Sequence, residues 1–160
     1  MAATIESVEK VVQENYVPEF HYLKYDTTPF QPFTKDLASA KGALITTGGV
    51  FLKGEPPFQD NYGLGDPSYR EIPSDVDTKK LMHYHEHYDH TNASKDINCI
   101  FPIERMRQLA KEGTIGPLAE TFYSFMGFVP IAHPLLTRTA PQVARKLKKE
   151  LVDYVLIAPV

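Results

Sequence analysis

The chain has 160 residues, of which 42% are hydrophobic and 23% are charged, and its formal net charge is −3 at pH 7. These values are typical of one globular domain and argue against extensive disorder, and the dispersed basic residues disfavour a nucleic-acid-binding surface. No apolar run approaches the roughly 18 residues of a membrane span, and the acidic N-terminus lacks the features of a signal peptide. Because Cys99 is the single cysteine and cannot form an internal disulfide, we expect a cytoplasmic protein.

Residues 1–39 are predicted to form an N-terminal helix and an extended arm. Hydrophobic residues recur at helical spacing from Thr4 to Glu14, and Thr4 suits the N-cap position. Aromatic residues and prolines follow between Asn15 and Pro32. This composition predicts an arm that lies either over a partner or over its own domain, and the sequence leaves both open.

Residues 40–160 are predicted to form the main domain, beginning with a buried strand. The apolar run from Gly42 to Thr47 ends in Gly48 and Gly49, which fits a strand followed by a tight turn. Ligands of parallel α/β sheets bind outside the carboxyl ends of the strands. Position alone therefore makes four residues candidates for a site: Thr46, Thr47, Gly48 and Gly49.

The remaining elements alternate between strands and helices. The predicted strands span residues 80–85, 121–129 and 153–158, the last of them buried, and the predicted helices span 102–112 and 139–151. Residues 51–73, rich in glycine and proline, are predicted to be a long connection, in which Arg70 either meets an anionic ligand or lies on the surface. We therefore expect an α/β fold with a doubly wound, mainly parallel sheet, flavodoxin-like or Rossmann-like in three layers, and incomplete at its C-terminus.

The segment from Leu81 to Pro102 holds four of the six histidines. Its residues 85–90 match H-x-H-x-D-H, which is the zinc motif of metallo-β-lactamase-type hydrolases, although most further ligands of that fold are missing downstream. Two other interpretations remain open: general acid–base or recognition chemistry by one or two histidines, and ordinary hydrogen-bonded loop residues. Cys99 is predicted to be an unreactive residue of the core.

Five blocks in a fixed order resemble one family. They are LITTGGVFLKG from Leu44, GDPSYREIP from Gly65, HYDH from His87, DINCIFP from Asp96 and SFMG from Ser124. This order resembles the selenoprotein B component of the glycine, sarcosine and betaine reductases, with the related small subunit of D-proline reductase. The likeness covers residues 43–160.

The resemblance implies an oxidoreductase subunit that reductively cleaves the α-carbon–nitrogen bond of glycine, a methylated glycine or D-proline. A disulfide is the electron acceptor when this reaction is written in the oxidising direction. A selenocysteine attacks the carbon, and a pyruvoyl group on a partner subunit activates amine substrates; thiol or selenol redox proteins are further partners. No cofactor or metal is expected in this chain itself. By resemblance, the substrate pocket is lined by Thr46, Gly48, Gly49, His85, His87, Asp89 and His90.

The family's redox motif is expected just after the segment that ends at Val160. One expectation is therefore a truncated chain that lacks its nucleophile, in which a UGA selenocysteine codon has been read as a stop; the role does not pass to Cys99. Two alternatives remain. One is a zinc-dependent hydrolase that uses His85, His87, Asp89 and His90, and the other is a non-catalytic binding or scaffold domain of the same fold.

Overall fold

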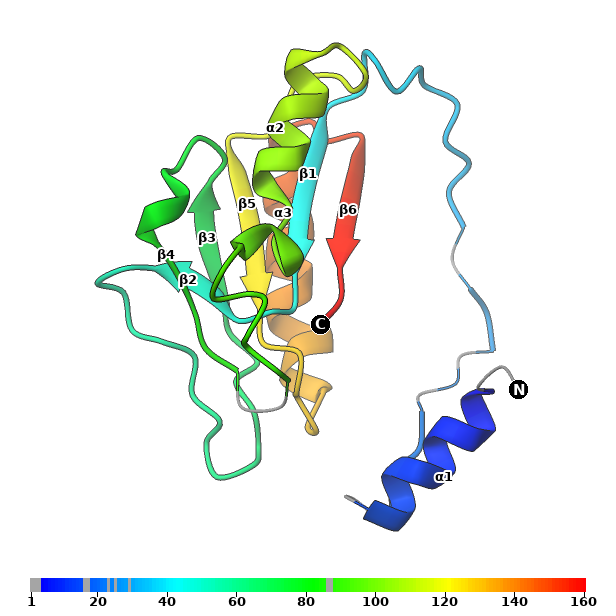
Figure 1. The fold of residues 1–160 in the computed structure, drawn as a ribbon. Coiled ribbons are helices and arrows are strands. Elements are labelled where there is room, and N and C mark those ends of the chain that lie inside the picture. The colour runs from blue at the N-terminus through cyan, green and yellow to red at the C-terminus, as the bar shows by residue number, and fades with distance from the viewer. Residues whose placement is uncertain (1–3, 16–17, 23, 25, 29, 86–87) are drawn as a thin grey trace. The chain divides into compact units, whose positions relative to one another are not determined.

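The computed structural model describes residues 4–15, 18–22, 24, 26–28, 30–85 and 88–160 (Figure 1). The chain divides into two compact units, residues 1–34 and 35–160. The first unit contains helix α1 (Ile5–Asn15), which confirms the predicted helix. The backbone N–H of Ser7 donates to Thr4 Oγ1 over 3.1 Å, and the N–H of Thr4 donates to Ser7 Oγ over 2.9 Å. This reciprocal capping explains why α1 begins after Thr4.

The described residues of the second unit form a four-stranded sheet with the order β3-β5-β1-β6. The strands are β1 (Gly42–Thr46), β3 (Tyr69–Pro73), β5 (Thr121–Phe125) and β6 (Tyr154–Ala158). Strand β1 pairs in parallel with both β5 and β6, whereas β3 pairs antiparallel with β5. A separate antiparallel ribbon joins β2 (Val50–Leu52) to β4 (Leu81–His83).

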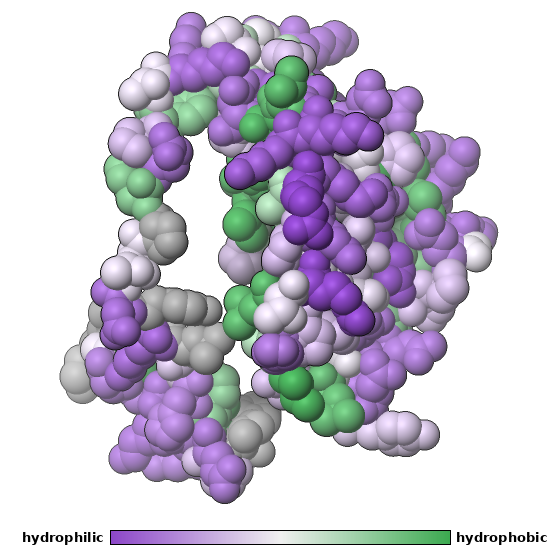
Figure 2. Space-filling view, turned by 180° about the vertical axis from the view of Figure 1, so that it is seen from behind, coloured by the Kyte–Doolittle hydropathy of each residue, from purple (hydrophilic) through white to green (hydrophobic). Residues whose placement is uncertain are grey.

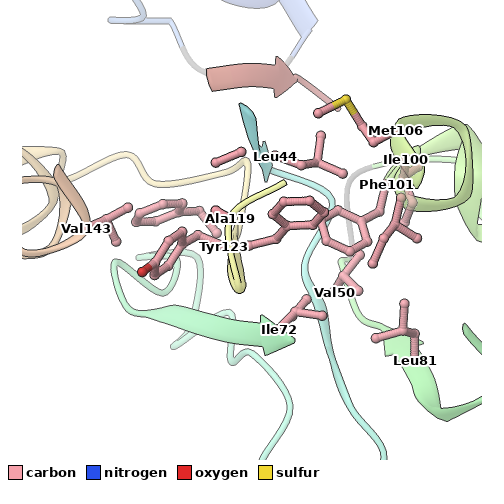
Figure 3. Close-up of a cluster of buried hydrophobic side chains, with 14 of the residues drawn as sticks. Leu44, Val50, Ile72, Leu81, Ile100, Phe101, Met106, Ala119, Tyr123 and Val143 are labelled. Atoms are coloured by element: carbon pink, nitrogen blue, oxygen red, sulfur yellow. The ribbon is translucent and has the colours of Figure 1, made fainter. Parts of the chain in front are cut away.

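Helices α2 (Ile103–Lys111) and α3 (Ala140–Lys149) cover opposite faces of the sheet (Figure 1). Figure 3 shows Met106 of α2 and Val143 of α3 on opposite sides of the central strands, with Leu44 and Tyr123 between them. All four side chains are buried. The exposed face of α3 is strongly hydrophilic (Figure 2). No helix in the described part of the chain is long and apolar enough to cross a bilayer.

The α/β class with a mainly parallel sheet is confirmed, and the finer doubly wound arrangement stays a prediction. Two strand predictions and one predicted connection need correction. The strand predicted at residues 80–85 lies outside the four-stranded sheet, because Leu81–His83 pairs with β2. The predicted connection at 51–73 contains β3 and part of β2. The predicted buried strand at 153–158 lies at one edge of the sheet, and Ile157 is 59% exposed.

Cys99 is exposed, so its predicted burial in the core is wrong. A short 3₁₀ turn (Ile97–Cys99) precedes α2, and the Asp96 side chain caps it by accepting from the N–H of Asn98. This turn directs the next two residues, Ile100 and Phe101, into the core instead. An apolar neighbourhood in sequence therefore did not determine the orientation of Cys99.

Candidate functional site

The carboxyl end of β1 is tied to the segment that precedes α2. The buried hydroxyl of Thr46 donates to the carbonyl of Ile100 over 2.6 Å and accepts from the N–H of Gly48 over 2.9 Å. Thr46 therefore lies where the sequence predicted, at the strand end. Its hydroxyl is engaged in holding two protein segments together.

The two glycines that follow β1 allow close approach of neighbouring segments. Gly49 has φ +66°, and a Cβ there would collide with the carbonyl oxygen of Tyr84. The N–H of Tyr84 donates to the Gly49 carbonyl over 3.0 Å. A Cβ at Gly48 would lie 3.0 Å from Ile100. The glycines thus bring the end of β1 against the residues that follow β4, where His85 lies.

Three histidines surround the ring of Tyr88, and we call these four residues the imidazole–phenol cluster. The ring centroid of Tyr88 lies 4.4 Å from that of His90, 5.1 Å from that of His85 and 6.4 Å from that of His83. His85 is buried, whereas the other three are partly buried. The segment from His83, the last residue of β4, to His90 thus gathers four titratable side chains in one place.

Polar contacts within the imidazole–phenol cluster converge on His83. Its Nδ1 lies 3.2 Å from Nδ1 of His90 and 3.3 Å from the hydroxyl of Tyr88, which is also 3.4 Å from the carbonyl of Gly48. Burial, and then the charge of His90, lower the pKa of His83. Burial raises the pKa of Tyr88, so this phenol stays protonated at neutral pH.

His85 extends the cluster to the carboxyl edge of the four-stranded sheet. A Cβ placed on Gly127, just beyond β5, would lie 3.0 Å from His85 Nε2 and 2.8 Å from the carbonyl oxygen of Val160. The N–H of Val160 donates to Thr47 Oγ1 over 2.9 Å. The ends of β1, β5 and β6 therefore meet beside one imidazole nitrogen, as the rule for parallel sheets predicts.

A pocket of about 990 Å³ opens beside the cluster. His83, His85 and His90 line it together with residues from the 3₁₀ turn before β4 and from the segment before α2. Such a volume suits a small polar ligand with room for water or for part of a partner. The pocket lies beside β4, which is not a strand of the mainly parallel sheet. The rule that ligands bind at the carboxyl ends of parallel strands therefore does not predict it.

The other site candidates are distributed as follows. His90 is in the imidazole–phenol cluster, whereas Asp89 is exposed and accepts from the N–H and hydroxyl of Thr91 over 2.9 and 2.6 Å. These hydrogen bonds lower the pKa of Asp89, so it is ionised at neutral pH. His87 lies outside the described residues. His83 and Tyr88 were not among the residues predicted for the site, although the alternation of Leu81, His83 and His85 put both histidines on one face.

The zinc motif does not form a metal site in the described part of the chain. Of its members His85, Asp89 and His90 are described, and no group of three or more His, Cys, Asp or Glu residues among the described ones could hold a metal ion. A zinc site at H-x-H-x-D-H would need such a group as its ligands. The hydrolase alternative therefore gains no support from these side chains.

Comparison with known proteins assigns the chain to a family. The model of the glycine/sarcosine/betaine reductase selenoprotein B family matches residues 4–159. The D-proline reductase subunit gamma of Acetoanaerobium sticklandii is 43% identical over 126 residues, which cover 79% of this chain and 51% of that protein. The glycine reductase complex component B subunit gamma of Symbiobacterium thermophilum is 33% identical over 159 residues, covering 94% of this chain and 35% of that protein.

The chain thus spans about half the length of the first relative and about a third of the second. The sarcosine reductase complex component B subunit beta of Peptoclostridium acidaminophilum is 31% identical over 125 residues, covering 75% of this chain and 28% of that protein. No solved structure matches. The family match extends over nearly the whole sequence, and the chain therefore belongs to the glycine/sarcosine/betaine reductase selenoprotein B family.

Proposed function

We propose that this chain is part of a cytoplasmic reductase subunit that, with a selenocysteine as nucleophile, cleaves the α-carbon–nitrogen bond of glycine, a methylated glycine or D-proline. Family membership supports the reaction class. Because the chain is 43% identical to a D-proline reductase subunit, D-proline is the first substrate to test. The structural observation that carries the proposal is the imidazole–phenol cluster, which lies between the 990 Å³ pocket beside β4 and the carboxyl edge of the sheet.

The proposed reaction requires a nucleophile and a source of protons. As a selenolate attacks the α-carbon, the selenium–carbon bond forms, the carbon–nitrogen bond breaks, and the leaving nitrogen takes the electron pair and a proton. A dithiol then supplies two electrons and becomes a disulfide: the selenium–carbon bond breaks, the α-carbon takes the electron pair and a proton, and the selenolate is released. His85 is the group of this chain best placed to deliver the proton, because imidazole exchanges protons near neutral pH and Nε2 lies at the strand ends.

The nucleophile and the electrophilic carbonyl are proposed to come from outside the described residues. In the family that the sequence resembles, the redox motif follows the segment equivalent to β6. The position of Val160 near His85 and Thr47 supports entry of that motif at this edge. A pyruvoyl group, expected on a partner subunit, would supply a carbonyl that activates the amine, and thiol or selenol proteins would deliver the electrons.

The test is turnover by the full-length chain assembled with its partner subunits. The assembled complex is expected to consume at least one of D-proline, glycine, sarcosine and betaine with a dithiol as reductant. The variant His85→Gln is expected to lower kcat by about 10²-fold or more, as loss of a general acid does. His133→Gln, which changes a histidine outside the pocket, is the matched control and should retain full turnover.

Two outcomes would contradict the proposal. An assembled complex that reduces none of the four substrates would remove the reductase assignment and favour a binding or scaffold role. A His85→Gln complex with unchanged kcat would remove the proton-transfer role while leaving the reductase assignment intact.

A further inference from the structure

His83 and His90 face one another edge to edge inside the pocket. Their Nδ1 atoms are 3.2 Å apart, while the ring centroids are 5.1 Å apart and the planes differ by 18°. Rings stacked face to face would bring their centroids nearly as close as their nitrogens, so these rings lie side by side. The contact is therefore a nitrogen-to-nitrogen hydrogen bond, which needs one donor and one acceptor.

Burial, and then the charge of His90, lower the pKa of His83 and so favour its neutral form, which has one N–H and one acceptor nitrogen. In the tautomer that we assign to this pair, His90 Nδ1 donates and His83 Nδ1 accepts. The Tyr88 hydroxyl is then directed to the Gly48 carbonyl rather than to His83. A neutral His83 that accepts at Nδ1 carries its proton on Nε2. That atom lies 3.5 Å from Ser94 Oγ, at the pocket wall.

The pocket wall around this pair favours an anionic acceptor group. Lys79 and Lys95 line the same pocket. Its two acids already accept hydrogen bonds from the protein: Asp96 from the N–H and side-chain amide of Asn98, and Glu104 from that amide and the Thr78 hydroxyl. Both acids are thus held by protein donors, and Lys79, Lys95, His83 and Ser94 offer donors to an anionic group.

We propose that His83 and Ser94 bind the carboxylate of the amino-acid substrate, with His83 Nε2–H and the Ser94 hydroxyl as donors and with His90 orienting the His83 ring. This inference rests on the proposed function and names the part of the substrate that the pocket recognises. A carboxylate oxygen within hydrogen-bond reach of both His83 Nε2 and Ser94 Oγ accepts from both, and the Nδ1 contact with His90 holds the His83 ring in place. All substrates of the proposed class share this carboxylate, whereas their nitrogens differ in substitution.

The test is calorimetric titration of the full-length chain, assembled with its partners, with matched ligand pairs. The probes are D-proline against D-prolinamide and glycine against glycinamide, which share an amine and differ in the carboxylate, and acetate as a bare carboxylate. His83→Leu and Ser94→Ala are expected to weaken D-proline and acetate binding by about tenfold or more. The two amides should bind the variants and the unchanged protein equally, and His133→Gln should leave every affinity unchanged.

A second variant separates binding from folding. His83→Gln restores a side-chain N–H donor, so it is expected to recover part of the lost D-proline affinity. If all His83 variants bind D-proline as tightly as the unchanged protein does, the proposal is overturned. Stoichiometric zinc that is lost on His83→Leu would also overturn it, since the pair would then be a metal site. If the complex reduces no substrate yet acetate binding depends on His83, the proposed function fails while the carboxylate site stands.

Discussion

At the scale of single residues, Thr46 connects two segments that are 54 residues apart in sequence. Replacing it with valine keeps the shape but leaves the Ile100 carbonyl and the Gly48 N–H without their partner. We expect Thr46→Val to lower the free energy of unfolding by about 1–3 kcal/mol, measured by urea denaturation. The exposed Thr114→Val is the control and should change it by less than about 0.5 kcal/mol. Equal stability of both variants would show that the buried hydroxyl does not hold these segments together.

Gly127 is a second residue whose substitution tests the site. Its backbone needs no positive φ, so the effect of a methyl group is steric, through contacts with Val160 and His85. We expect Gly127→Ala to cost about 1–3 kcal/mol of stability and to shift the imidazole NMR signals of His85. Gly54→Ala is the control for the His85 signals. A Cβ at Gly54 meets nothing within 4 Å, so this variant should leave those signals unmoved, although the φ of +98° strains alanine there. Unmoved His85 signals in Gly127→Ala would contradict the close approach.

The sequence predicted the end of β1 better than the contacts around it. Strand-end logic placed Thr46 and Gly49 correctly because an apolar run followed by glycines is a local signal. Tyr88 was not predicted because its role depends on a contact with Gly48, which is 40 residues away in the sequence. Local patterns carry no information about such a contact.

At the scale of elements, Arg70 fastens the loop that precedes β3. Its guanidinium donates to the carbonyls of Pro56 and Pro57 and lies 4.2 Å from the ring centroid of Phe58. We expect Arg70→Lys to lower stability by about 1–2 kcal/mol, because lysine cannot reproduce the fork of donors, and to speed proteolysis between residues 53 and 68. Arg105→Lys, on the exposed face of α2, should do neither. Unchanged proteolysis of Arg70→Lys would show that the loop is held by other contacts.

Helices were easier to predict than strands for a physical reason. Periodic apolar residues and end signals gave α2 and α3 nearly correct bounds, since both signals are local. Strands β2 and β3 were missed because glycine and proline dominate between them, and their partners β4 and β5 come later in the sequence. The apolar run of β6 predicted burial, yet a strand sequence does not reveal whether a further neighbour covers it.

At the scale of the whole molecule, His83 links stability to pH. The native pKa of His83 is lowered, whereas the unfolded chain binds a proton near the ordinary value of about 6.5. Between these two values the unfolded state holds more protons, so stability falls as pH decreases. We expect His83→Gln to reduce the slope of unfolding free energy between about pH 7 and pH 5. His133→Gln is the control, and an equal change of slope in both variants would contradict the role of His83.

The edge of the sheet at β6 is the most hydrophobic exposed strand of the described chain, and it predicts association. Leu156 and Ile157 are 43% and 59% exposed, and Figure 2 shows hydrophobic side chains along this edge. An uncovered strand edge of this kind pairs readily with other strands. We expect Ile157→Lys to lower the light scattering of concentrated protein, because a charge on the edge opposes pairing, and to change stability by less than about 0.5 kcal/mol. Leu109→Lys, 37% exposed on α2, adds the same charge elsewhere. If it lowers scattering equally, net charge rather than the β6 edge controls association.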